Sequence, residues 1–170
     1  MPSSPKPIIA LIDGRSGAGK THYAASLASA RGAQVVSLDE VYPGWDGLDA
    51  GSWHIYTQVL LPISQGLPAR YQRWDWATHS PGEWVTIAHD TELIVEGCGA
   101  IRRESLPLAS VSVYLDAPEQ VRHERAVQRD GERFEAQWQR WALQEQRFLM
   151  IHHSDRIADK VEKIGVSNGA

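Results

Sequence analysis

A glycine-rich segment near the N-terminus has residue types that could bind phosphate groups. Residues 14–21, Gly-Arg-Ser-Gly-Ala-Gly-Lys-Thr, match the pattern G-x-x-x-x-G-K-[ST]. Glycines permit a tight turn whose backbone N–H groups point inward, and the N-terminus of a following helix adds a partial charge of roughly +0.5. The pattern predicts a nucleoside triphosphate site, and a chance match in a glycine-rich turn is the alternative, on the order of one per cent. The expected ligands of the phosphates are Gly14, Ser16, Gly17, Ala18, Gly19, Lys20 and Thr21.

Two residues of this segment have more specific expected roles. Lys20 should reach the β and γ phosphates, and Thr21 should place its hydroxyl on Mg²⁺, a cation that takes oxygen ligands. Glu96 ends the apolar run Leu-Ile-Val-Glu at 93–96, where a carboxylate could act near the same ion. A strand-end glutamate without a role is the alternative for Glu96. The sequence therefore predicts a Mg²⁺ site formed by Thr21 and Glu96.

Phosphoryl transfer also needs a base for the acceptor and cations over the transferred group. Asp39 directly follows the second predicted strand and could be the base, although a loop carboxylate that caps a turn would look the same. Arg122, Arg125 and Arg129 share one face of a predicted helix, and Arg133 follows them. A solvated helix face is the usual explanation of such a row. Near a phosphate loop it is also what a mobile lid would use to neutralise charge and exclude water.

Tryptophan is abundant, with 7 in 170 residues. Each could simply be a core residue. Several lie in loop-like sequence beside acidic residues and a histidine, which favours an apolar cleft with a few polar groups that would suit a flat ring. The five in the segment between the second and third predicted strands are Trp45, Trp53, Trp74, Trp76 and Trp84.

Alternating apolar runs and helical segments must position these residues. Strands are predicted at 8–12, 34–38, 93–96, 111–115 and 160–164, and helices at 19–30, 53–64, 118–129 and 134–150, with a loop at 39–51. A strand, a helix and a strand in about 30 residues form a βαβ unit with a parallel crossover. The pattern predicts a three-layer α/β/α domain with a parallel central sheet. We expect residues 1–7 to be a disordered tail and residues 8–170 to be one domain, with a lid at 118–134.

Composition narrows the classes of function. The 17 Lys and Arg against 21 Asp and Glu give a net charge of −4, so no broad basic face for nucleic acid is expected. A signal sequence or an apolar span of about 18 residues is not seen, and the single cysteine, Cys98, suits a reducing compartment. These features predict a cytoplasmic protein with neither membrane nor nucleic-acid partners. They leave the oligomeric state open.

In their order along the chain, these residues resemble the uridine kinase family of phosphate-loop kinases. Asp39-Glu40-Val41-Tyr42 is similar to the family's Asp-x-Phe-Tyr segment, and residues 74–80 are similar to its Tyr-Asp-Phe-x-x-His-Ser segment. Glu96-Gly97 matches the family's strand end. The resemblance implies a P-loop kinase fold, ATP and Mg²⁺ as cofactors, and Asp39 as catalytic base together with Lys20 and the three lid arginines. The acceptor-binding residues that it implies are Asp39, Tyr42, Asp49, Trp74, Trp76 and His79.

The acceptor side departs from the family pattern. Val41 replaces an aromatic residue, Trp74 replaces a tyrosine, and the segment around 45–53 is short. The resemblance therefore predicts an ATP-dependent kinase for a small hydroxyl compound, with a uridine- or cytidine-like nucleoside as the first expectation. A kinase for a sugar acid or vitamin precursor, and a regulatory ATPase module that only binds nucleotide, are the alternatives.

Overall fold

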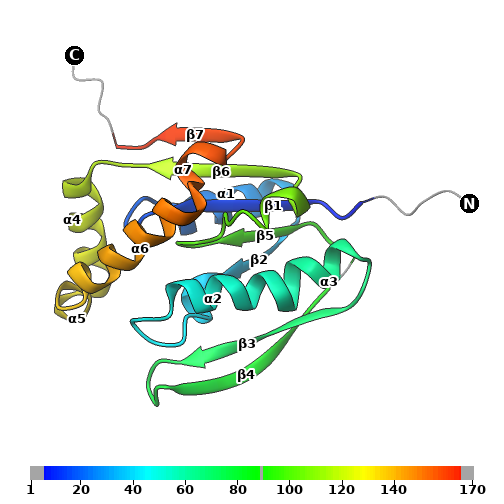
Figure 1. The fold of residues 1–170 in the computed structure, drawn as a ribbon, viewed down its shortest axis with the longest axis horizontal. Coiled ribbons are helices and arrows are strands. Elements are labelled where there is room, and N and C mark those ends of the chain that lie inside the picture. Colours follow the sequence, from blue (N-terminus) through cyan, green and yellow to red (C-terminus); the bar gives the residue numbers. More distant parts are fainter. Residues whose placement is uncertain (1–5, 89, 166–170) are drawn as a thin grey trace, which may run out of the picture.

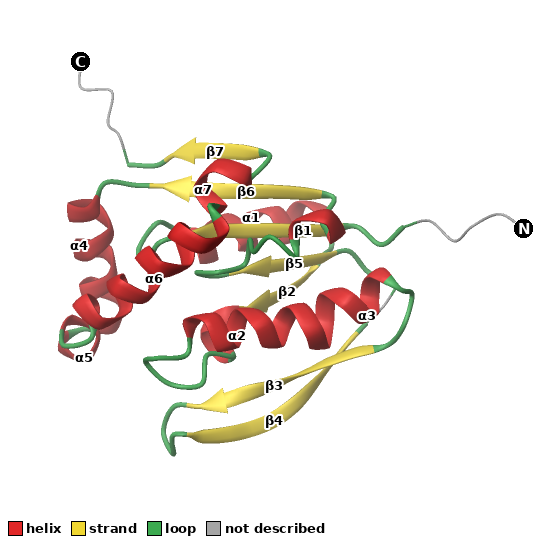
Figure 2. Ribbon diagram, in the orientation of Figure 1, coloured by secondary structure: helices red, strands yellow, loops and turns green. Residues whose placement is uncertain are grey.

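A five-stranded parallel sheet forms the centre of the protein (Figures 1 and 2). The computed structural model describes residues 6–88 and 90–165. All four strand pairings in this sheet are parallel. In spatial order the strands are β2 (Gln34–Ser37), β5 (Leu93–Glu96), β1 (Ile9–Gly14), β6 (Val111–Asp116) and β7 (Lys160–Lys163).

Both faces of the sheet are covered, so alternate side chains of β1 lie in two different cores. Ala10 and Ile12 pack with Ala24 of α1 (Lys20–Arg31) on one face. Ile9 and Leu11 face the larger core, which contains the remaining helices that cover the sheet. The central strands β1 and β5 are mostly apolar and buried along their whole length because both faces of the sheet are covered there. The predicted three-layer α/β/α fold with a parallel sheet is confirmed.

The helices on the second face belong to two separate segments of the chain. The first is α2 (Leu48–Ile55), continued by a π-helical segment (Tyr56–Leu60) and α3 (Leu61–Ser64). The second comprises α4 (Glu119–Asp130), α5 (Glu132–Glu135), α6 (Trp138–His152) and α7 (Ser154–Ile157). In Figure 1, α4 and α5 lie beyond the carboxyl ends of the strands, where ligands bind in open α/β sheets.

The predicted loop at 39–51 is wrong in two places. Leu38–Glu40 forms a 3-10 turn, and α2 already begins at Leu48. Leu48 and Ile55 are buried, and Gly51 allows the helix to approach Tyr42 so closely that a Cβ there would lie 2.7 Å from the ring. The glycine therefore serves close packing inside a helix, although the same residue in the sequence favoured a loop.

A β-hairpin that the sequence analysis did not predict extends from the domain (Figure 1). It consists of β3 (Ala69–Asp75) and β4 (Ser80–Ile87), which pair only with each other. Ala69 and Tyr71 are buried against the main core, while the intervening Arg70 is exposed. The hairpin carries Trp74, Trp76 and His79 on or between its strands, so it replaces the predicted loop in this region.

The remaining differences from the predicted elements are small. The helix expected at 134–150 is divided into α5 and α6, and the helix expected at 118–129 is shifted by one residue. Leu106–Leu108 form a further 3-10 turn. Within the described residues, no helix is both long and apolar enough to cross a bilayer. Most of the predicted tail, residues 1–5, lies outside the described residues.

Candidate active site

The phosphate loop connects β1 to α1 at the carboxyl edge of the sheet. Gly17 and Gly19 have φ angles of +81° and +97°, which side chains with a Cβ rarely adopt. A Cβ on Gly17 would also lie 2.0 Å from the carbonyl oxygen of Arg122, so the loop is packed directly against the first turns of α4. The glycines are therefore required both for the turn and for the contact.

A cavity of about 380 Å³ opens over this loop. Gly14 and Ala18 do not line it, and Ala18 is fully buried and bonds back to the Arg15 carbonyl. These two residues shape the loop, and the others face the space that the phosphates would take. The sequence-predicted residues that line the cavity are Ser16, Gly17, Gly19, Lys20, Thr21, Asp39, Glu96 and Arg129.

Lys20 is held at the floor of this phosphate cavity. Its ammonium donates a hydrogen bond to the Arg15 carbonyl at 3.0 Å, and the residue is 8% exposed. Burial disfavours the charged form, but the acidic groups around the ammonium, Asp39, Glu145 and Glu96 among them, outweigh burial and raise the pKa of Lys20. The side chain is therefore a permanent cation beside the loop.

Thr21 and Glu96 meet as the sequence analysis predicts for a cation site. The Thr21 hydroxyl donates to the Glu96 carboxylate at 3.2 Å. Burial raises the pKa of Glu96, and the charge of Asp39 acts in the same direction. A hydroxyl and a carboxylate supply hard oxygen donors, which are the ligands that Mg²⁺ takes. Among the described residues no three His, Cys, Asp or Glu side chains form a metal cluster by themselves, so phosphate oxygens would have to complete this site.

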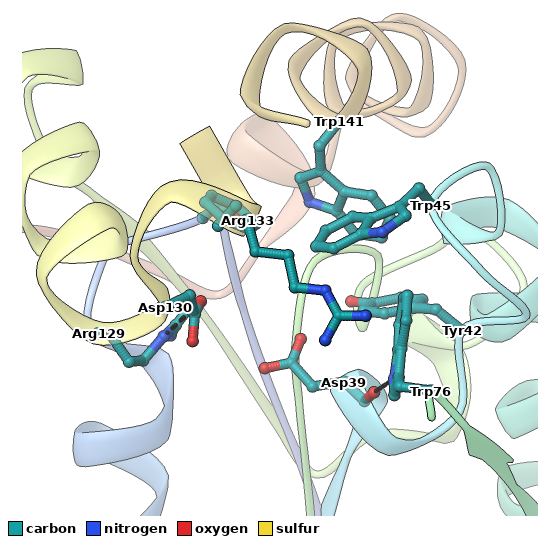
Figure 3. Close-up of a pocket in the computed structure, with 10 residues that line it drawn as sticks. Asp39, Tyr42, Trp45, Trp76, Arg129, Asp130, Arg133 and Trp141 are labelled. Carbon is teal, nitrogen blue, oxygen red and sulfur yellow. Dashed lines mark hydrogen bonds and ion pairs between the residues drawn. The ribbon is translucent and has the colours of Figure 1, made fainter. Parts of the chain in front are cut away.

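A second cavity, of about 340 Å³, lies beside the phosphate cavity (Figure 3). Five of its ten lining residues are aromatic, and Trp45 packs on Trp76 with ring centroids 5.0 Å apart. Asp39, Arg129 and Ser16 line both cavities, so the two spaces meet at these residues. The aromatic lining residues are Tyr42, Trp45, Trp76, Phe134 and Trp141.

Asp39 is fixed between the two cavities by contacts from other elements. The indole N–H of Trp76, from the hairpin, donates to the Asp39 carbonyl at 2.9 Å (Figure 3). The nearby Tyr42 hydroxyl donates to the Cys98 carbonyl at 2.7 Å, after β5. The hairpin thus contributes a wall of the second cavity and holds the backbone of the predicted base.

Three acceptor-binding residues implied by the family resemblance do not line this second cavity. The Asp49 side chain is 74% exposed and forms an ion pair with Arg102 at 3.2 Å. His79 lies in the exposed hairpin turn with a φ of +50°. Trp74 is half-buried, and its indole nitrogen lacks a hydrogen-bond partner among the described residues. The chain around these positions is a short helix and a hairpin, and this backbone directs them elsewhere.

The three predicted lid arginines have different surroundings. Arg122 is 6% exposed and donates to the carbonyls of Ala117 at 3.0 Å and Ser16 at 3.4 Å, so it lines neither cavity and holds the loop in place. Arg125 lies close to the loop, with its Nη1 3.8 Å from the position of a Cβ on Gly19. Arg129 lines both cavities and pairs with Asp130. The shared helix face therefore does not give the three residues a shared environment.

Several lining residues were not among the candidates from the sequence. Arg133 and Phe134 come from α5, and Trp141 comes from α6. Trp45 was noted only as one of five tryptophans of the cleft. Arg133 had a signal, because it follows the row of arginines, but Phe134 and Trp141 looked like ordinary positions of a buried helix face.

Comparison with known proteins supports the fold and leaves the sequence relationship distant. No protein-family model matches the chain, and no curated protein matches it either. A solved structure described as a possible uridine kinase from Bacillus stearothermophilus has a TM-score of 0.61 at 18% identity, covering 94% of this chain and 90% of that one. A protein from Silicibacter sp. TM1040, provisionally described as a fructose transport system kinase, has a TM-score of 0.67 at 16% identity and covers 95% and 92%. The fold implied by the uridine kinase resemblance is confirmed.

Proposed function

We propose that the protein is an ATP- and Mg²⁺-dependent kinase that phosphorylates a hydroxyl group of a small molecule. The observation that carries this proposal is the position of Asp39, which lines both the phosphate cavity and the aromatic cavity. A carboxylate at the junction of a donor site and an acceptor site is placed to act on the hydroxyl that attacks the donor. A protein that only bound nucleotide would not need the second cavity.

On the donor side, the loop amides and Lys20 bind the phosphates of ATP. Thr21 and Glu96 would hold Mg²⁺ together with the phosphates, where the ion would supply positive charge against the phosphate oxygens. Arg125 lies beside Gly19 of the loop and Arg129 lines the phosphate cavity, so they are the cations that we assign to the transferred group. Because Arg122 is anchored by burial, any closure of a lid over 118–134 would begin after this residue.

On the acceptor side, Asp39 orients the hydroxyl and receives its proton. The acceptor oxygen forms a bond to the γ phosphorus, and the bond between that phosphorus and the β–γ bridging oxygen breaks. ADP leaves with the electron pair, and the proton passes from Asp39 to solvent. The aromatic walls exclude water, which would otherwise compete with the acceptor.

The acceptor is the finer part of the proposal. Aromatic walls suit a flat ring, as in the nucleoside that the resemblance implies. The resemblance implies that Asp49, Trp74 and His79 recognise the sugar and base of a nucleoside. None of these three residues lines the cavity. A nucleoside therefore remains one class of acceptor to test, beside sugar acids and vitamin precursors.

The first experiment measures ADP release from Mg²⁺-ATP with nucleosides, nucleoside monophosphates, sugars, sugar acids and vitamin precursors. One class should accelerate ADP release, and Lys20→Ala serves as the blank. Asp39→Asn should lower kcat about 100-fold or more with little change in ATP affinity. Asp155→Asn, which removes an exposed carboxylate from α7, is the matched control and should behave as the wild type.

Two results would contradict the proposal. Full activity of Asp39→Asn with the best acceptor would remove this residue from the reaction. Tight ATP binding with no acceleration by any acceptor would favour a regulatory nucleotide-binding module, in which hydrolysis sets a conformation.

A further inference from the structure

Four charged side chains line the aromatic cavity, and two of them neutralise each other. Arg129 and Asp130 form an ion pair, with Nη2 and Oδ2 2.8 Å apart (Figure 3). The remaining two are Asp39, which the reaction uses as its base, and Arg133. The cavity therefore contains one cation that neither an ion pair nor the proposed reaction accounts for.

Arg133 differs from the other arginines near the site. It lines the aromatic cavity but not the phosphate cavity, whereas Arg129 lines both. Across residues 6–88 and 90–165, no hydrogen bond or ion pair engages its guanidinium, while Arg15 and Arg140 are paired with carboxylates. In Figure 3 its side chain reaches from α5 into the cavity, with the guanidinium pointing toward Asp39 and Trp76. The side chain is exposed, so a ligand can reach it.

We infer, on the basis of the proposed kinase function, that the acceptor carries an anionic group in addition to the hydroxyl that Asp39 orients. Arg133 binds this anionic group. A guanidinium presents several N–H donors in a planar fork that fits the two oxygens of a carboxylate or a phosphate. Asp39 repels such a group, so the anionic group contacts the guanidinium of Arg133 and the hydroxyl contacts Asp39. The opposite charges of Arg133 and Asp39 therefore fix the orientation of the acceptor in the cavity.

The other role open to Arg133 is contact with the transferred phosphoryl group. That role needs a side chain at the junction of the two cavities, and Arg129 occupies it. Arg133 faces only the acceptor space, so it reads the acceptor and not the donor. A cavity of about 340 Å³ is at the small end of ligand sites, which fits a hydroxy acid or a small phosphate ester.

The test uses pairs of acceptors that differ in the anionic group. Suitable pairs are glycerate and glycerol, pantothenate and pantothenol, and uridine monophosphate and uridine, so carboxylate and phosphate are separate arms. ADP release gives kcat and KM for each, and the quenching of tryptophan fluorescence gives binding without turnover, because three tryptophans line the cavity. We expect the anionic member of at least one pair to bind and react tenfold better or more.

Variants of Arg133 separate charge from shape. Arg133→Gln should raise the KM of the anionic acceptor at least tenfold and leave its neutral partner unchanged, and Arg133→Lys should restore part of the loss. Arg147→Gln removes an exposed arginine from α6 that lines neither cavity and should have no effect.

The inference and the kinase function fail in different ways. If neutral acceptors are phosphorylated as well as anionic ones and Arg133→Gln does not discriminate between them, the kinase function stands and the inference is overturned. If no anionic compound binds or reacts better than its neutral partner, the inference is likewise overturned. Preferential binding of an anionic compound that Arg133→Gln abolishes supports the inference, even if ADP release is absent.

Discussion

The carboxylate of Glu145 accepts a hydrogen bond from the backbone N–H of Ser16 at 2.7 Å. Glu145 lies on α6 and is 4% exposed, so a buried charge from a distant helix is bonded directly to the phosphate loop. Its other oxygen pairs with Arg15 Nε at 3.3 Å, and Arg15 also donates to the Ala142 carbonyl. Two consecutive residues of the loop are therefore tied to α6, the helix that also carries Trp141 of the aromatic cavity.

This contact predicts that Glu145 positions the phosphate loop. Glu145→Ala leaves the buried Ser16 N–H without a partner and removes the carboxylate that pairs with Arg15, which should lower the free energy of unfolding by about 1–3 kcal/mol and weaken ADP binding about tenfold. Glu145→Gln keeps an acceptor for the Ser16 N–H and should have a smaller effect. Urea unfolding and calorimetric titration with ADP measure the two quantities.

Glu124→Ala provides the control for Glu145, because it removes an exposed glutamate that contacts only Gln120 through its side chain among the described residues. It should leave ADP affinity unchanged. A folded Glu145→Ala variant that binds ADP as tightly as the wild type would show that the loop keeps its shape without this contact.

Asp13 predicts a pH dependence of stability. Its buried carboxylate accepts hydrogen bonds from the backbone N–H groups of Gly14, Gly99 and Ile101. Burial outweighs these bonds and raises the pKa of Asp13 to about 6, from 3.8 in an unfolded chain. The folded state therefore holds this proton more tightly, and the stabilisation is complete below pH 4 and lost as pH rises through about 6.

The measurement for Asp13 is the free energy of unfolding in urea between pH 4 and pH 7, for the wild type and for Asp13→Asn. Asparagine resembles the protonated acid but does not titrate. The stability of the wild type relative to the variant should fall by roughly 2 kcal/mol across this range. A difference that is constant with pH, or that grows toward pH 7, would contradict the predicted direction.

Cys98 should be chemically inert in the folded protein. The thiol is 5% exposed and donates to Glu145 Oε2 at 3.4 Å. Burial raises the pKa of Cys98 to about 12, so only about one thiol in ten thousand is ionised at pH 8. A thiol reagent such as DTNB should label one cysteine per chain in urea and almost none in buffer. Stoichiometric labelling of the folded protein within minutes would contradict this prediction.

The sequence predicted those parts of the site that are local in the chain. The phosphate loop, Thr21 and Glu96 follow from a motif and from a strand end, and parallel strands bring their carboxyl ends to one edge. The contact of Glu145 with Ser16 could not be predicted, because it joins residues 129 positions apart through the packing of α6. The role of Arg122 also depends on a contact between distant parts of the chain. Its spacing in the sequence is that of a lid residue, but its contact with the phosphate loop buries it.

The hairpin was missed although its sequence contained a signal. Ala69 and Tyr71 alternate with polar residues, but Pro81 and Gly82 within the second strand are typical of loops. A two-stranded hairpin tolerates both residues, because each strand has one edge that pairs with no other strand. The position of Trp76 beside Asp39 depends on this hairpin, so this residue of the cavity wall could be named from the sequence but not placed.

Asp49 provides a test of how far the family resemblance extends to the acceptor. Its exposed carboxylate pairs with the buried Arg102, outside the aromatic cavity, whereas Trp45 forms part of the cavity wall. Asp49→Asn should therefore change the KM of the acceptor less than twofold, since this side chain does not line the cavity. Trp45→Leu should raise that KM about tenfold, because it removes an aromatic surface that the acceptor contacts. Steady-state kinetics with the acceptor identified from the panel measure both variants. A tenfold rise in KM for Asp49→Asn at constant kcat would contradict this prediction. It would mean that α2 moves to bring this carboxylate onto the acceptor, so that Asp49 belongs to the acceptor site.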